Sequence, residues 1–311
     1  MVQQINLNKY IGEVKRNLNL EISDEIIEKD LLLTFILAEF EKNGLGKELI
    51  FKGGTLLSRN YLKYHRFSED LDFVHKNANE LRELKRKTRE RKIKLFIDSF
   101  VPELEKITHS LGLKFSKDRR DTRFCTILHG RSVYIFRVYY AETRFVKIEI
   151  NFVEKIIHPP KEVSVNAITD FFNSKELLFS LGLKFENFSV LSYPLEEIIL
   201  EKYRCILTRN ELKERDLFDL FLIKDSLKIN ITHAVEKIKS SSLIKRDLNT
   251  NITVKLSLLQ KDEFFKSDER IEDLAIVKYN VEEFKQFKER IKPNLIEICE
   301  RFLECAAPLH K

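Results

Sequence analysis

Polar and apolar residues alternate along two segments of the first half of the chain, and the first of these is residues 68–74. Successive side chains of a strand point to opposite faces, so Ser68, Asp70 and Asp72 would share one face and Leu71 would lie on the other. The pattern therefore predicts a strand whose polar face carries two carboxylates.

The second alternating segment is residues 145–152. Val146 and Ile148 would face a core, while Lys147 and Glu149 would face the opposite side. If this strand lies beside the first one, Glu149 adds a third carboxylate to the same polar face.

Apolar residues at helical spacing predict helices at residues 24–43 and 79–111. The segment His158-Pro159-Pro160 resembles a domain boundary, and the pattern after it is mainly helical. The sequence thus predicts an α/β (α+β) fold, with a first domain at residues 1–160 and a mainly helical second domain at residues 161–311.

Paired glycines follow a short apolar run at residues 49–51 and precede the carboxylate strand. Gly53 and Gly54 allow a sharp turn and the close approach of a ligand. Thr55 comes next, and residues 56–63 are compatible with a helix. A helix start presents free N–H groups and a positive dipole end, which suits a phosphate.

Asp70 and Asp72 would lie about 7 Å apart along one strand face. Two such carboxylates repel unless a cation lies between them, and Mg²⁺ prefers carboxylate and phosphate oxygens. A D-x-D pair alone is more often a solvated strand face. Together with the glycine turn, it indicates a nucleotide-handling site.

The glycine turn followed by D-x-D resembles the signature of the DNA polymerase β-like nucleotidyltransferases, whose fold contains a mixed sheet. More narrowly, the AbiEii/AbiGii toxin family is similar in the strings F-K-G-G-T-L-L-S and R-F-S-E-D-L-D-F. Members of that family are nucleotidyltransferase toxins of type IV toxin–antitoxin and abortive-infection systems. The 14 residues between Thr55 and Asp70 slightly exceed the usual spacing.

In the second half, Lys202 projects along the apolar stripe of a predicted helix, and an unpaired buried ammonium is costly. Its partner would be a nucleotide phosphate or an acid of the next helix, where Asp216 and Asp219 share a face. A Lys202–Asp219 or Arg215–Asp219 ion pair would simply join two helices. The string E-K-Y…R-D-L-F-D-L also resembles the downstream motif of the toxin family.

The resemblance assigns roles to named positions of this chain. It implies catalytic residues at Asp70, Asp72, Glu149, Lys202 and Asp216. It implies nucleotide contacts from Gly53, Gly54, Thr55, Ser68 and Lys202. It implies that Mg²⁺ or Mn²⁺ would be bound by Asp70, Asp72 and Glu149, with a nucleoside triphosphate as substrate.

The chain has 311 residues and a net charge of +6, and residues 82–94 hold eight basic and two acidic residues. This basic run is either a solvated helix face or a surface for the phosphates of a nucleic acid. The four cysteines are scattered and read as reduced thiols, and no apolar run predicts a membrane span. His65 and His75 are expected at the surface.

By resemblance, the acceptor is RNA, plausibly the 3′ end of tRNA, and a cognate antitoxin would neutralise the protein in the cytoplasm. Two alternatives remain open. One is a nucleotidyltransferase acting on a small molecule such as an aminoglycoside. The other is a toxin that binds nucleotide or RNA without turnover. The basic run favours RNA over a cationic small molecule.

Overall fold

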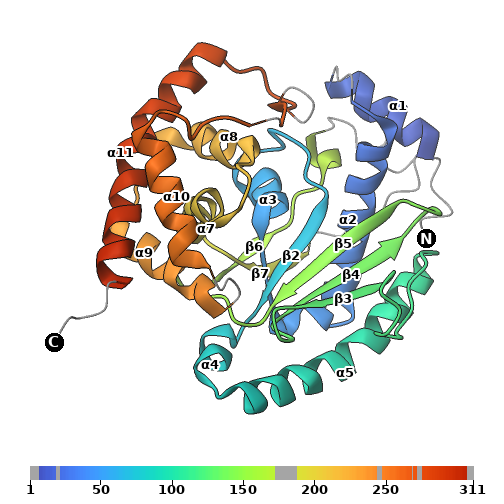
Figure 1. Ribbon diagram of the computed structural model, residues 1–311. Coiled ribbons are helices and arrows are strands. Elements are labelled where there is room, and N and C mark those ends of the chain that lie inside the picture. Colours follow the sequence, from blue (N-terminus) through green and yellow to red (C-terminus); the bar gives the residue numbers. More distant parts are fainter. Residues whose placement is uncertain are drawn as a thin grey trace. The chain divides into compact units, whose positions relative to one another are not determined.

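The computed structural model describes residues 7–18, 22–171, 188–243, 247–267, 269–271 and 275–306 (Figure 1). The chain divides into two compact units, each treated by itself. Unit 1 comprises residues 1–153 and 160–193, and unit 2 comprises residues 154–159 and 194–311.

Unit 1 is built on a seven-stranded sheet with the order β3-β4-β5-β2-β1-β7-β6. The strands are β1 (Leu49–Lys52), β2 (Asp70–His75), β3 (Cys125–Leu128), β4 (Val133–Tyr139), β5 (Phe145–Asn151), β6 (Lys161–Ser164) and β7 (Ser189–Ser192). β2 is parallel to β5 and β1 to β7, whereas the other neighbours are antiparallel. The expected α/β fold with a mixed sheet is confirmed, and β6 and β7 continue the sheet beyond the predicted boundary at residue 160.

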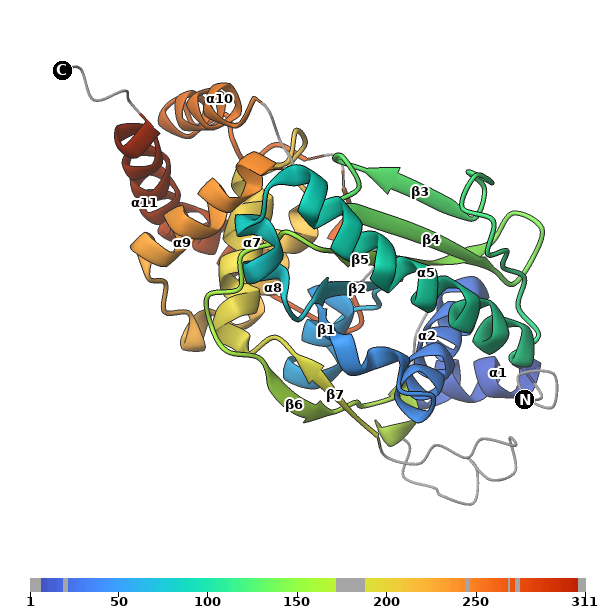
Figure 2. The same cartoon turned by 90° about the horizontal axis from the view of Figure 1, so that it is seen from below.

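Helices α2 (Asp24–Lys42) and α5 (Arg86–Ser110) cover one face of this sheet (Figure 2). Phe40 of α2 stacks on Phe73 of β2 with ring centroids 5.9 Å apart, and Phe100 of α5 lies 5.6 Å from Phe136 of β4. The apolar positions of the strands face these helices. The smaller helices of unit 1 are α1 (Leu7–Leu18), η2 (Leu45–Glu48), α3 (Gly53–Leu56), η3 (Leu57–Tyr61), α4 (Ala78–Glu83) and η4 (Ile168–Phe171).

The helix predicted at residues 56–63 is replaced by the last turn of α3 and the π-helical turn η3. Arg59 in η3 is fully buried, and its guanidinium donates to the Asp30 carboxylate at 2.8 Å and to the Thr34 hydroxyl at 2.9 Å. Tyr64 then adopts a left-handed conformation with φ of 59°. This buried ion pair joins η3 to α2, and local spacing does not reveal it.

Two further expectations are corrected. The helix predicted at residues 79–111 is two helices, α4 and α5, because Leu84 and Lys85 between them are extended. His65 and His75 are buried rather than at the surface. His75 lies on the apolar side of β2, where its ring packs edge-on against Phe96 of α5 at 4.9 Å.

Unit 2 is mainly helical in its described part, as expected. Its longer helices are α7 (Leu195–Thr208), α8 (Glu214–Leu222), α9 (Ile231–Lys239), α10 (Leu248–Gln260) and α11 (Val281–Ala306). Phe218 and Phe221 of α8 pack against Phe284 of α11 at 5.7 and 5.2 Å. Among the described residues, no helix combines the length and hydropathy needed to cross a membrane.

Candidate active site

The register of the sheet in unit 1 brings the three predicted carboxylates together. β2 and β5 are neighbours, which is the condition under which Glu149 joins the other two carboxylates, with Asp72 opposite Glu149 and Asp70 opposite Lys147. On the other side of β2, Lys52 of β1 lies opposite Asp72. Because strand side chains alternate, these residues share the sheet face turned away from α5.

The start of α3 leaves little room beside Gly53 and Gly54. Gly53 has φ of 81°, and a Cβ at this residue would approach Asp72 Oδ2 closer than the 3.0 Å that real side chains allow. A Cβ at Gly54 would lie 2.7 Å from Arg66 Nη2 and 3.1 Å from Ser68 Oγ. The backbone therefore passes directly beside the Asp72 carboxylate, the Arg66 guanidinium and the Ser68 hydroxyl.

Thr55 ties the turn to the carboxylate strand. Its buried hydroxyl donates to the Asp70 carbonyl oxygen at 2.5 Å and lies 2.9 Å from Ser68 Oγ. Through these contacts, the Thr55 side chain fixes the backbone of Asp70 and the side chain of Ser68. The prediction that Gly53, Gly54, Thr55 and Ser68 meet a nucleotide stays a prediction.

A lysine that was not predicted as a site residue lies among the carboxylates. Lys147 Nζ is 2.9 Å from Asp70 Oδ2 and 3.7 Å from Glu149 Oε2. All three side chains remain about a third exposed, at 29%, 33% and 29%. The only sequence signal for Lys147 was its place beside Glu149 on the polar face of the strand.

The electrostatics of the site reflect crowded, partly buried charges. Burial raises the pKa of Asp70, and Asp72 raises it further against the opposing effect of Lys147. Burial and Asp72 likewise raise the pKa of Glu149. Burial lowers the pKa of Lys147, but attraction to the three carboxylates outweighs it and leaves the pKa raised. The site thus favours an additional positive charge.

The chemistry of this donor set fits a divalent cation, since hard oxygen ligands are those that Mg²⁺ prefers. Within the described residues, however, no three acidic, histidine or cysteine side chains are gathered as a metal site. Lys147, which contacts Asp70 and Glu149, occupies part of the space between the carboxylates.

In unit 2, Lys202 of α7 reaches the acids of α8. Its Nζ lies 2.8 Å from Asp216 Oδ1 and 2.5 Å from Asp219 Oδ2, and all three side chains are buried. Arg209 also contacts Asp216. Burial raises the pKa of Asp216, but Lys202 and Arg209 outweigh it and lower the pKa. The pairing of Lys202 with Asp219, one of the two structural alternatives, is present, and the roles of Lys202 and Asp216 toward a nucleotide stay predictions.

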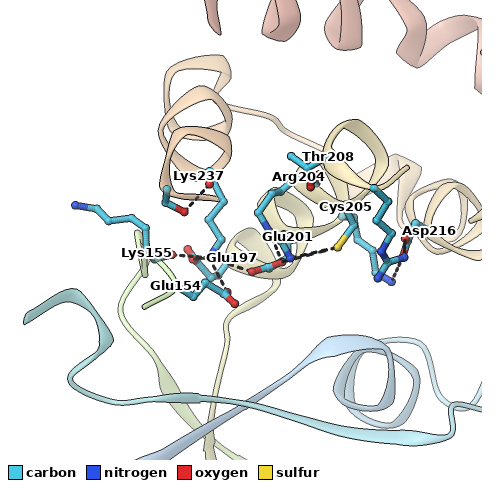
Figure 3. A network of polar contacts seen from close by, with 12 residues as sticks. Glu154, Lys155, Glu197, Glu201, Arg204, Cys205, Thr208, Asp216 and Lys237 are labelled. Atoms are coloured by element: carbon cyan, nitrogen blue, oxygen red, sulfur yellow. Dashed lines mark hydrogen bonds and ion pairs between the residues drawn. The ribbon is translucent and has the colours of Figure 1, made fainter. Parts of the chain in front are cut away.

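A third lysine–carboxylate cluster, after those of Lys147 and Lys202, was not predicted at all (Figure 3). Lys237 of α9 is fully buried, and its Nζ lies 2.6 Å from Glu197, 3.0 Å from Glu154 and 3.4 Å from Glu201. The Glu197 carboxylate also accepts the backbone N–H of His158 at 2.8 Å. These contacts hold residues 154–159 against α7 and α9.

Arg66, like Lys147, was not predicted as a site residue. It is buried, and its Nη1 donates to the Phe67 carbonyl at 2.9 Å while Nη2 lies beside Gly54. Its place at the start of the string R-F-S-E-D-L-D-F, two residues before the alternating segment, was the available signal. Arg66 adds a guanidinium to the glycine turn.

Solved structures with the same fold include MenT4, a nucleotidyltransferase toxin from Mycobacterium tuberculosis H37Rv. It is 16% identical, with a TM-score of 0.57 over 97% of this chain and 95% of that one. JHP933 from Helicobacter pylori matches at 15% identity over 92% of this chain and 94% of that one, with a TM-score of 0.39. No curated protein matches the sequence.

The family comparison covers most of the chain. The family described as nucleotidyl transferase AbiEii toxin, type IV TA system, matches residues 36–305. This range includes the glycine turn, the three carboxylates and the helices that carry Lys202 and Asp216. The chain therefore belongs to the AbiEii family and is a nucleotidyltransferase toxin of the type IV toxin–antitoxin class.

Proposed function

We propose that this protein transfers a nucleoside monophosphate from a nucleoside triphosphate to an RNA acceptor, with the 3′ end of tRNA as the expected site of transfer. The observation that carries the proposal is the register that puts Asp70, Asp72 and Glu149 on one sheet face beside the Gly53-Gly54 turn. Carboxylates next to a tight backbone turn are the parts that a metal-assisted transfer of a nucleotidyl group needs.

Asp70, Asp72 and Glu149 would hold Mg²⁺ or Mn²⁺. When bound, such a cation neutralises charge on the phosphates and aligns the attacking and leaving oxygens. Glu149, whose pKa is raised by burial and by Asp72, is suited to accept the proton of the attacking hydroxyl. The hydroxyl oxygen forms the new bond to the α-phosphorus, the bond to the β-phosphate bridging oxygen breaks, and pyrophosphate leaves.

The glycine turn would contact the triphosphate through Gly53, Gly54, Thr55 and Ser68. Gly54 lies beside the Arg66 guanidinium, which supplies a positive charge for phosphate oxygens. We assign Lys202 to the charge of the triphosphate and Asp216 to the sugar or the acceptor, on the family motif alone.

The proposal also specifies RNA as the acceptor and the cytoplasm as the location of the protein. The net charge of +6 is compatible with a polyanion, and a cationic aminoglycoside would suit a basic protein poorly. Because the family belongs to toxin–antitoxin systems, we expect a cognate antitoxin as a protein partner.

The test incubates purified protein with Mg²⁺, total tRNA and each α-labelled nucleoside triphosphate in turn. Asp70→Asn should remove transfer, because it takes away one negative oxygen ligand. Glu69→Gln is the matched control, since Glu69 is the neighbouring acid and pairs with Lys29 of α2 at 2.7 Å. Its transfer should stay within about twofold of the wild type.

Label on RNA that depends on Asp70 and not on Glu69 supports the proposal. Full transfer by Asp70→Asn would overturn the catalytic assignment. Label on protein or on an added aminoglycoside, with none on RNA, would replace the acceptor. No transfer with any nucleotide, together with tight nucleotide binding, would favour a toxin that binds without turnover.

A further inference from the structure

The sheet face that carries the carboxylates continues past β5 to the edge strand. Across β5 and β4, Glu149 lies opposite Ile135, Lys147 opposite Arg137, and Phe145 opposite Tyr139. These residues are half-buried, whereas the alternate residues of both strands are buried. Apolar and basic side chains therefore extend the active face over β4, the strand next to β5 in Figure 1.

Arg137 is the cation of this extension. Its Nη1 donates to the Thr126 hydroxyl of β3 at 2.8 Å and to the Thr122 carbonyl at 3.3 Å. Both acceptors are neutral, so these bonds fix the guanidinium without cancelling its charge. Such a preorganised guanidinium suits a phosphate oxygen.

Two aromatic rings lie next to it. The guanidinium carbon of Arg137 is 5.7 Å from the centre of the Phe145 ring, and the Phe145 and Tyr139 rings are 5.3 Å apart at 52°. Half-exposed aromatic rings beside a basic side chain are the combination that binds unpaired bases by stacking and backbone phosphates by charge.

The basic run of residues 82–94 lies elsewhere. Most of it belongs to α5, which packs on the opposite face of the sheet through Phe96 and Phe100 (Figure 2). An acceptor held there would be separated from Asp70 by the thickness of the sheet. The extension over β4 shares a face with Asp70, so the sheet does not separate the two.

We propose that Arg137, Tyr139 and Phe145, here called the strand platform, bind the single-stranded end of the acceptor next to the carboxylates. Two strand spacings separate the Cα atoms of Asp70 and Arg137, a distance of about 10 Å. The platform residues thus lie one or two strands away from Asp70. This inference rests on the proposed function, because it concerns the acceptor of that same site.

The test measures binding of a fluorescein-labelled 12-nucleotide single-stranded RNA to the full chain by anisotropy, without nucleotide and at several salt concentrations. Arg137→Gln should weaken binding about tenfold and reduce the slope of log affinity against log salt by about 0.7, as loss of one phosphate contact does. Phe145→Leu should weaken binding about tenfold with little change in slope.

Two controls keep the test specific. Arg137→Lys retains the charge and should restore most of the salt slope. Lys87→Gln with Arg91→Gln removes two exposed charges from α5 and should leave affinity within about twofold. Thermal unfolding of each variant shows whether the platform residues also support the fold.

Folded Arg137→Gln and Phe145→Leu proteins that bind RNA like the wild type would overturn the platform, as would a larger loss from the α5 double variant. Absence of RNA binding by the wild type would overturn it as well. If RNA is labelled in the transfer assay while the platform variants bind normally, only this inference fails. If transfer goes to another class of acceptor, the proposed function fails with it.

Discussion

Two of the lysine–carboxylate clusters, those of Lys147 and Lys237, contain the same chemical groups in different surroundings. Lys147 in unit 1 contacts Asp70 and Glu149 and is 29% exposed, whereas Lys237 in unit 2 contacts three glutamates and is completely buried. Water and ions reach the first cluster but not the second. Exposure therefore separates the Lys147 cluster, which can exchange partners, from the Lys237 network, which supports the fold.

The largest expected effect tests the structural role of Lys237. Lys237→Met should lower the free energy of unfolding by about 3–5 kcal/mol, because it leaves buried carboxylates without their cation. Urea denaturation measures the loss. Lys239→Met on the same helix, whose side chain is exposed, should change stability by less than about 0.5 kcal/mol. Equal effects of the two variants would show that the Lys237 network is not structural.

The open cluster depends on backbone geometry next to it. Gly53→Ala should destabilise the protein by about 1–3 kcal/mol, since Ala is strained at φ of 81° and its Cβ would meet Asp72. Nucleotidyl transfer should fall by more than the loss of folded protein accounts for, because the Asp72 side chain must move. Gly12→Ala is the control, as a Cβ there meets nothing within 4 Å. Unchanged transfer in a folded Gly53→Ala protein would contradict the role of the turn.

The next prediction tests whether Lys147 in the exposed cluster can be replaced by a metal ion. Because its ammonium contacts Asp70 and Glu149, Lys147→Gln should tighten Mn²⁺ binding about threefold to tenfold in the absence of nucleotide. Electron paramagnetic resonance of free Mn²⁺ measures this directly. Lys147→Arg retains the charge and should bind Mn²⁺ like the wild type. Weaker binding in Lys147→Gln would mean that the lysine assists the cation instead of competing with it.

The smallest expected effect is on the pH dependence of stability. The folded state holds the pKa of Glu149 above its ordinary value. As the pH rises above about 4.3, the unfolded chain therefore loses this proton first, and the folded state loses stability until the pH passes the folded pKa. Lys237, whose pKa is raised by its glutamates, stays charged throughout this range.

Glu149→Gln should therefore gain stability relative to the wild type between pH 4 and neutrality, by up to about 1 kcal/mol after allowance for solvent. Urea denaturation of both proteins at the two pH values, in the presence of EDTA, measures the difference. A difference that does not change with pH would show that Glu149 titrates normally.

Much of the active face could be predicted from short patterns. The period of two identified both carboxylate strands, and Val146 and Ile148 of β5 are buried as expected. The paired glycines identified the turn. Patterns of this kind succeed because the alternation of side chains in a strand is a local property of the backbone.

Other features could not be read from the chain. Arg59 of the π turn η3 meets Asp30, 29 residues earlier. Lys237 meets Glu154 across 83 residues and Glu197 across 40. Contacts between residues so far apart produce no periodic pattern in the sequence. A charged residue that is buried by such a contact therefore cannot be told from a surface residue by its sequence alone.

The sequence by itself determined the alternation that gives two strands their polar faces, the glycines that permit the turn and the motifs that mark the family. Tertiary structure alone decided that Glu149 stands opposite Asp72, that Lys147 enters the carboxylate cluster, and that the basic helix α5 lies behind the sheet. The physical reason is that periodicity reports which side of an element is buried, whereas the neighbours of each side chain depend on contacts between distant segments.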